Sequence, residues 1–151
     1  MMIYVDADAC PVKEDISLLA IKHDVAVMMV CNGGIRPHPH ALIGLKIVPA
    51  GPDEADKWIA DEIKASDILV TSDIPLAAKA LEKDAFVLRP DGSQLTAKNI
   101  GNILATRDLM SDIRAADPFH QSKSKPFSKA DKGSFRQKLA SLLAQQKIKR
   151  T

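Results

Sequence analysis

The sequence predicts a single α/β domain with a central, mostly parallel sheet of about five strands between two layers of helices. Short apolar runs alternate with segments of helical periodicity, which is the pattern of strand–helix–strand crossovers. The chain of 151 residues, 46% of them hydrophobic, is long enough to form one core. Only 4% of the residues are aromatic, so this core must be mainly aliphatic.

Five apolar runs are predicted to be strands, because each is short and is followed by polar or turn-forming residues. They cover residues 3–5, 25–30, 45–48, 68–70 and 86–88. Segments with apolar residues at helical spacing are predicted to be helices, and they cover residues 11–22, 53–65, 75–83, 99–115 and 131–148. The glycines and prolines of residues 31–41 predict a loop, and a short extended piece is expected at 94–96 after a turn.

The charge is divided unevenly along the chain. Residues 1–118, the predicted α/β domain, hold 12 Lys and Arg against 18 Asp and Glu. Residues 119–151 hold nine Lys and Arg against one Asp, and are predicted to form a basic loop and helix appended to the same unit. This asymmetry fits either a solvated terminal helix or an anionic partner, such as RNA, held near an acidic site.

Composition also indicates the cellular compartment in which the protein is expected. No run of 18 apolar residues is present, so no membrane span is expected. The N-terminus reaches an acid at Asp6 without a basic start, which favours a strand over a signal peptide. Cys10 and Cys31 are too few for a disulfide framework, so we expect a cytoplasmic protein without a disulfide-linked partner. The oligomeric state is left open.

Aspartates follow three of the first four predicted strands: Asp6 and Asp8 the first, Asp53 and Asp56 the third, and Asp73 the fourth. Parallel sheets bind ligands at the carboxyl ends of their strands, near the point where the strand order reverses. Carboxylates cannot crowd together fully ionised without a cation. Oxygen ligands select Mg²⁺ or Mn²⁺, and such ions activate water for phosphodiester hydrolysis. The sequence therefore predicts an acidic, metal-type site.

Some of these acids also suit a structural role. Asp53 is placed to cap the helix predicted at 53–65, with Asp56 as the second acid of a capping box. Asp73 suits a helix start before Pro75. Asp6 is hardest to explain in this way, because a carboxylate at the end of a buried strand needs a partner.

Other polar residues near the predicted strand ends are candidate contacts for substrate or for metal-bound water. They are Asn32, Arg36, Thr71, Ser72 and Arg107. Cys10 is predicted to be a buried thiol, although its place at a helix start would also suit a nucleophile. His38 and His40 are predicted to be loop residues, with zinc binding as the alternative.

Five segments, spread in order over nearly the whole chain, together resemble the YaiI/YqxD family of bacterial proteins. They are DADACPVK at 6–13, GPDEADKWI at 51–59, VTSDIPLA at 70–77, NIGNIL at 99–104 and PFSKAD at 126–131. That family is placed among PIN-like domains, a fold of metal-dependent nucleases, so the resemblance implies a PIN-like domain at 1–118.

The resemblance also implies roles for individual acids. Asp6 and Asp73 match the strand-end acids of the PIN-like pattern, and Asp53 and Asp56 occupy the place of its mid-domain acid. Asp8 has no certain counterpart. The resemblance implies one or two Mg²⁺ or Mn²⁺ ions and RNA as substrate.

Two other functions fit parts of the sequence. A haloacid-dehalogenase-like phosphatase would use Asp6 as nucleophile, since IYVDADAC and ILVTS resemble its first two motifs. Against it, Cys10 stands where Thr or Val is expected, and residues 86–88 run into Arg89 rather than paired acids. A non-catalytic RNA- or ribosome-associated module would instead use the basic tail, whose aromatic residues suit either base stacking or docking onto the body. These aromatics are Phe119, Phe127 and Phe135.

Overall fold

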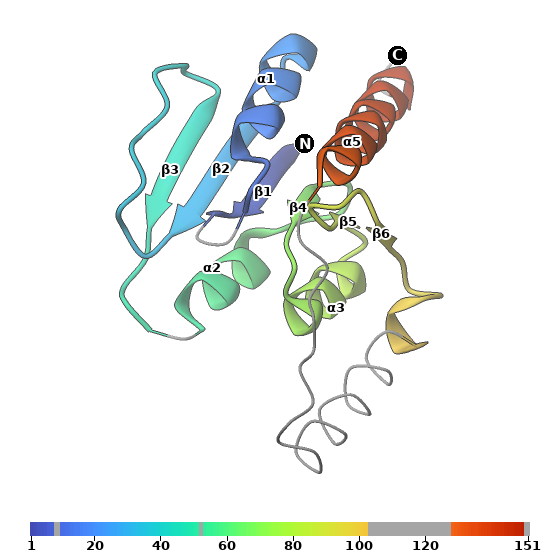
Figure 1. Cartoon of the computed structure of the whole chain (residues 1–151). Helices are drawn as coiled ribbons and strands as arrows, with labels where there is room; N and C mark the ends of the chain where they lie inside the picture. The colour runs from blue at the N-terminus through green and yellow to red at the C-terminus, as the bar shows by residue number, and fades with distance from the viewer. Residues whose placement is uncertain (8–9, 52, 103–127, 150–151) are drawn as a thin grey trace.

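The computed structural model describes residues 1–7, 10–51, 53–102 and 128–149 of the chain. Its strands are β1 (Met2–Asp6), β2 (Ala26–Cys31), β3 (Ile43–Ile47), β4 (Ile68–Val70), β5 (Phe86–Leu88) and β6 (Gln94–Leu95). They form a six-stranded sheet in the order β3-β2-β1-β4-β5-β6 (Figure 1). The first five strands are parallel, and β6 pairs antiparallel with β5. The predicted α/β class is confirmed, and the sixth strand is the short extended piece expected after the turn.

Helices cover both faces of the sheet. They are α1 (Lys13–His23), α2 (Glu54–Glu62), α3 (Ile74–Glu82) and α5 (Lys129–Lys149). Figure 1 shows α1 and α5 on one side of the sheet, and α2 and α3 on the other. Side chains of β1 alternate accordingly, because successive residues of a strand point to opposite faces. Ile3 and Val5 belong to the core cluster beneath α1 and α5, whereas Tyr4 belongs to the cluster beneath α2 and α3.

Some helix and strand ends differ from those predicted. Helix α2 ends at Glu62, three residues before the predicted position, and Ile63 is already extended. The cause is the buried side chain of Asp67, which accepts hydrogen bonds from the backbone N–H of Lys64 and of Met2 at 2.9 and 3.0 Å. These bonds turn the chain into β4. The helix predicted at 99–115 is visible only at residues 100–102, and its remainder lies outside the described residues.

Helix α5 is a layer of the core rather than a peripheral addition. The four apolar residues predicted to share one side of it are all buried: Phe135, Leu139, Leu142 and Leu143. Their burial confirms that Phe135 docks onto the body. Phe119, Phe127 and the predicted boundary at residue 118 lie outside the described residues.

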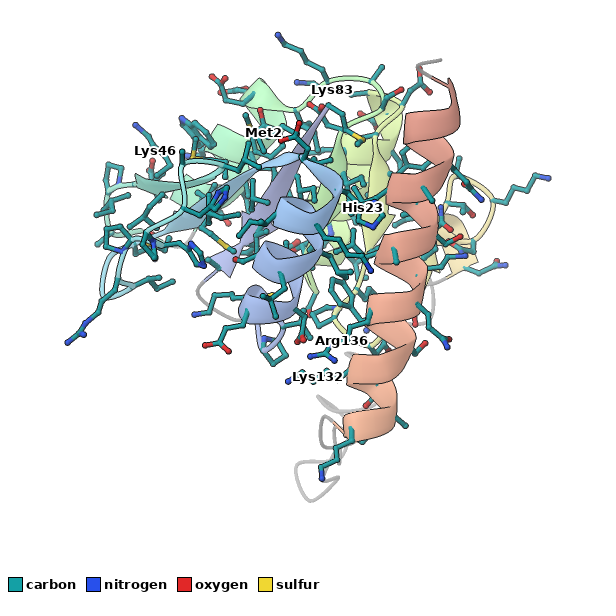
Figure 2. The ribbon with its side chains drawn as sticks, turned by 90° about the horizontal axis from the view of Figure 1, so that it is seen from above. Met2, His23, Lys46, Lys83, Lys132 and Arg136 are labelled. Carbon is teal, nitrogen blue, oxygen red and sulfur yellow. The ribbon has the colours of Figure 1, made fainter. Side chains whose placement is uncertain are left out.

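Ion pairs between a buried acid of α1 and two partly exposed basic residues of α5 join these helices. Asp15, which is only 3% exposed, forms a salt bridge with the guanidinium group of Arg136. Lys132 Nζ lies 3.6 Å from the other carboxylate oxygen of Asp15. Figure 2 shows Lys132 and Arg136 extending from α5 toward α1. Two of the basic residues in the C-terminal segment therefore neutralise a buried acid of the body. In the described part of the chain, no helix has the length and apolar character needed to cross a membrane.

Candidate functional site

The strand order reverses between β1 and β4, since the chain first builds outward through β2 and β3 and then returns to add β4 and β5. In a parallel sheet this reversal opens a crevice at the carboxyl ends of the two central strands. Asp6 is the last residue of β1, and Thr71, Ser72 and Asp73 follow β4 directly. The fold therefore places the two strand-end acids predicted from the sequence on either side of the switch point.

Thr71 connects these two acids. Its hydroxyl donates a hydrogen bond of 3.3 Å to Asp6 Oδ2 and accepts one of 3.0 Å from the backbone N–H of Asp73. The Thr71 side chain is 2% exposed, so this hydroxyl acts inside the protein. Thr71 therefore orients Asp6 relative to the start of α3, while the expected direct contact with substrate stays a prediction. Ser72, in contrast, is exposed.

Asp73 has both of the roles considered for it. Its Oδ1 accepts a hydrogen bond of 3.0 Å from the backbone N–H of Leu76, so the side chain caps α3. The same carboxylate is also hydrogen-bonded to Asp56. Capping holds the Asp73 side chain in one orientation, and in that orientation it faces the neighbouring acid.

Asp56 is the residue most affected by this crowding. Burial raises its pKa to about 7, with further contributions from the negative charges of Asp73, Asp6 and Asp53 and from the hydrogen bond to Asp73. Each of these carboxylates disfavours ionisation of Asp56. Four of the five predicted acids are therefore close enough to interact, although they come from three separate segments.

Asp53 occupies the N-cap position of α2 but makes no capping hydrogen bond with its side chain. The capping role considered for it, and the capping box with Asp56, are therefore wrong. Its carboxylate instead lines a pocket of about 340 Å³ between the beginnings of α2 and α3. The pocket is lined by Asp53, Asp56, Lys57, Asp73, Pro75, Leu76 and Lys79.

A divalent cation fits the chemistry of this site, because its donors are carboxylate oxygens and it has more negative charge than it can hold without raising a pKa. Asp6, Asp53, Asp56 and Asp73 are the residues that would hold such an ion. Within the described residues, however, no three acids, histidines or cysteines are arranged as a ready metal site. Asp8, the fifth predicted ligand, lies outside those residues.

Of the predicted contacts for phosphate or substrate, Arg36 is placed apart from the acids. Arg36 lines a separate pocket of about 250 Å³ on the α1 side of the sheet, together with Lys13 and His38. Asn32 is exposed in the same loop after β2. Arg107 lies outside the described residues. The structure therefore places Arg36 away from the acidic pocket.

Two lysines line the acidic pocket and were missed in the sequence. Lys57 directly follows Asp56 on α2, and Lys79 lies on α3. Their signal was available, because each stands on a helix that begins at a predicted site acid. It was hidden among the 21 Lys and Arg of the chain.

The structure confirms the predictions that Cys10 is a buried thiol and that His38 and His40 are loop residues. Cys10 is a buried free thiol, and burial raises its pKa to about 11, so it is not a ready thiolate. His38 and His40 use their Nδ1 atoms to accept hydrogen bonds from the backbone N–H groups of His40 and Leu42, at 3.0 and 3.1 Å. These bonds shape the loop between β2 and β3.

Comparison with known proteins agrees with the motifs. Residues 4–145 match the family described as "Uncharacterized BCR, YaiI/YqxD family". A UPF0178 protein of Cereibacter sphaeroides strain KD131 is 56% identical over 133 residues, which are 88% of this chain and 82% of the relative. A UPF0178 protein of Rhodospirillum centenum is 44% identical over 144 residues, covering 93% of this chain and 94% of the relative. No solved structure matches the chain.

Proposed function

Since this chain belongs to the YaiI/YqxD family, whose description assigns no activity, we propose a function from its site: a divalent-metal-dependent, PIN-like ribonuclease. The metal ligands would be Asp6, Asp56 and Asp73, assisted by Asp53 and Asp8. The reaction would be hydrolysis of a phosphodiester bond, and the metal Mg²⁺ or Mn²⁺.

One observation supports this proposal above the others. Acids from the end of β1, the start of α2 and the end of β4 gather at the switch point of a parallel sheet, where burial, together with the charges of these acids, raises the pKa of Asp56 to about 7. Such strong perturbation in a crevice is typical of functional sites. A cluster of acids with only a structural role would be unfavourable, because crowding destabilises the ionised form of each acid.

A bound Mg²⁺ or Mn²⁺ would supply Lewis acidity and an activated water. The residues of the chain would supply order and proton exchange. Thr71 holds Asp6, and the backbone N–H of Leu76 holds Asp73, so both carboxylates are oriented before any ligand arrives. Asp56, with its pKa of about 7, would release its proton to bind a cation near neutral pH.

Calorimetric titration of Mn²⁺ tests the metal site. The wild type is expected to bind Mn²⁺ and to release up to one proton per ion at pH 6, seen by repeating the titration in buffers of different ionisation enthalpy. Asp6→Asn should lose the binding. Asp84→Asn is the matched control, because Asp84 is an exposed acid in a turn before β5, where its φ of 63° suits Asn. If the wild type shows neither specific binding nor a Mn²⁺-dependent rise in Tm, the proposal is wrong.

The phosphatase alternative predicts a different covalent chemistry. It requires an aspartyl adduct at Asp6 when beryllium fluoride is added, and turnover of a phosphomonoester. A metal-dependent nuclease should cleave single-stranded RNA in Mn²⁺ and form no such adduct.

The free, buried state of Cys10 and Cys31 supports placing this activity in a reducing cytoplasm.

A further inference from the structure

The acidic pocket continues into a second hollow. This hollow, of about 360 Å³, is lined by Lys57, Ala60, Asp61, Lys79, Glu82 and Lys83, all from α2 and α3. It shares Lys57 and Lys79 with the acidic pocket. The two hollows therefore form one groove, the α2/α3 groove, which leads away from Asp56 and Asp73 along the outer faces of the two helices.

The lysines of the α2/α3 groove differ in their state. Lys83 Nζ donates a hydrogen bond to the carbonyl oxygen of Ala60, so it ties α3 to α2. Lys57 and Lys79 are exposed, and neither forms a salt bridge with any residue that the structure describes. Both residues line the two parts of the groove, and they remain available to an external anion.

This arrangement favours a long polyanionic substrate over a small phosphoester. A small phosphomonoester would need only the acidic pocket, whereas cations extending beyond the acids along a groove suit the neighbouring phosphates of a longer polyanion. Lysine binds phosphate as a point charge, without fixed geometry. Asp61 and Glu82 in the outer part of the groove limit the attraction, so binding should be moderate and sensitive to salt.

We propose that the α2/α3 groove is the binding path for a single-stranded polynucleotide, with Lys57 and Lys79 each contacting a phosphate next to the scissile one. This inference rests on the proposed nuclease function and adds to it the path of the substrate backbone and two residues that contact it. Both lysines line one groove, so they contact one backbone, and a duplex is not expected to bind better than a single strand.

Fluorescence anisotropy with a short, labelled oligouridylate tests the groove. Phosphorothioate linkages keep the probe intact, and the titration is done in Mg²⁺ at several salt concentrations. For a single strand, log affinity falls with log salt, and each lost phosphate contact makes this slope less steep by about 0.7. Lys57→Gln/Lys79→Gln should therefore weaken binding and reduce the slope by about 1.4.

The matched control is Lys22→Gln/Lys64→Gln. Both lysines are exposed, and they lie near the amino ends of β2 and β4, at the edge of the sheet opposite the acids. The control makes the same change in net charge and should keep the wild-type slope. Equal slopes for the wild type and Lys57→Gln/Lys79→Gln, or an equal loss in the control, would overturn the inference, as would tighter binding of a duplex of the same sequence.

Mn²⁺ calorimetry on the same proteins separates this inference from the proposed function. Specific Mn²⁺ binding by the wild type with a slope that ignores Lys57 and Lys79 would refute the groove alone. A slope that depends on these lysines in a protein without a Mn²⁺ site would refute the metal-dependent function and keep the groove.

Discussion

At the scale of single residues, the raised pKa of Asp56 connects the candidate site with folding stability. In the unfolded chain its carboxyl group returns to an ordinary pKa near 4, whereas burial and the nearby acids hold it at about 7 in the native state. Between these two values the native state binds more protons than the unfolded state. The free energy of unfolding therefore falls as pH rises through this window.

We expect Asp56→Asn to remove most of this pH dependence. Between pH 5 and pH 8 the wild type should lose stability on the order of 1 kcal/mol more than the variant, a figure reduced for solvent screening because Asp56 is only partly buried. At pH 8 the variant should be the more stable of the two. Urea unfolding at both pH values measures the difference, and Asp84→Asn should follow the wild type. If stability depends on pH in the same way in the wild type and in Asp56→Asn, the pKa of Asp56 is not raised in the native state.

At the scale of elements, the position of α5 depends on a glycine in another part of the chain. Gly92 lies in the turn between β5 and β6 with a φ of 93°, a conformation that favours glycine. A Cβ atom there would lie 2.5 Å from Ser134 Oγ and 2.8 Å from the backbone nitrogen of Phe135. The backbone of α5 can therefore pack this closely only against a residue without a side chain.

Gly92→Ala should destabilise the protein by about 3 kcal/mol, because it combines backbone strain with overpacking against α5. Gly133→Ala, on α5 itself, is the control. A Cβ at Gly133 meets nothing within 4 Å, so alanine there should stabilise the helix by about 0.5–1 kcal/mol. Urea denaturation of both variants gives the comparison, and a neutral Gly92→Ala would show that α5 can move away from the turn at little cost.

At the scale of the whole molecule, the C-terminal segment is both basic and part of the core. Fully burying a large apolar side chain stabilises a protein by about 1.5–3 kcal/mol, and α5 buries four of them. Their total is comparable with the entire stability of a typical domain, about 5–15 kcal/mol. Helix α5 therefore cannot be treated as a removable nucleic-acid anchor.

Deleting residues 129–151 should give a chain without cooperative thermal unfolding. The expected signs are loss of near-UV circular dichroism and binding of a hydrophobic dye, because the sheet face beneath α5 becomes exposed. A truncated protein that unfolds cooperatively near the wild-type midpoint would contradict the structural role of α5.

The non-catalytic RNA-binding alternative needs a gentler variant than this deletion. Lys129 and Lys138 are exposed on α5 and leave the ion pair of Asp15 with Arg136 intact. If the α2/α3 groove is the binding path, Lys129→Gln/Lys138→Gln should keep the wild-type salt slope for the oligouridylate. A slope reduced by about 1.4 in this variant instead would favour the tail as the anchor.

The sequence alone was enough for features that depend on neighbouring residues. The predicted bounds of β4 and β5 agree with the structure residue by residue, because a short apolar run between polar residues has few other ways to be buried. The acids at the carboxyl ends of β1 and β4 were found for the same reason. Once the strands were parallel, their ends had to share one edge of the sheet.

Only the tertiary structure decided features that depend on residues far apart. Asp53 is suited to a cap by its position, but its side chain lines the pocket. Asp15 and Arg136 pair across 121 positions of the chain. No local sequence pattern indicates that Lys57 and Lys79 line one groove, or that Arg36 lies apart from the acidic pocket. The physical reason is that packing of α2 against α3, and of α5 against α1, selects among many charged residues that look alike in the sequence.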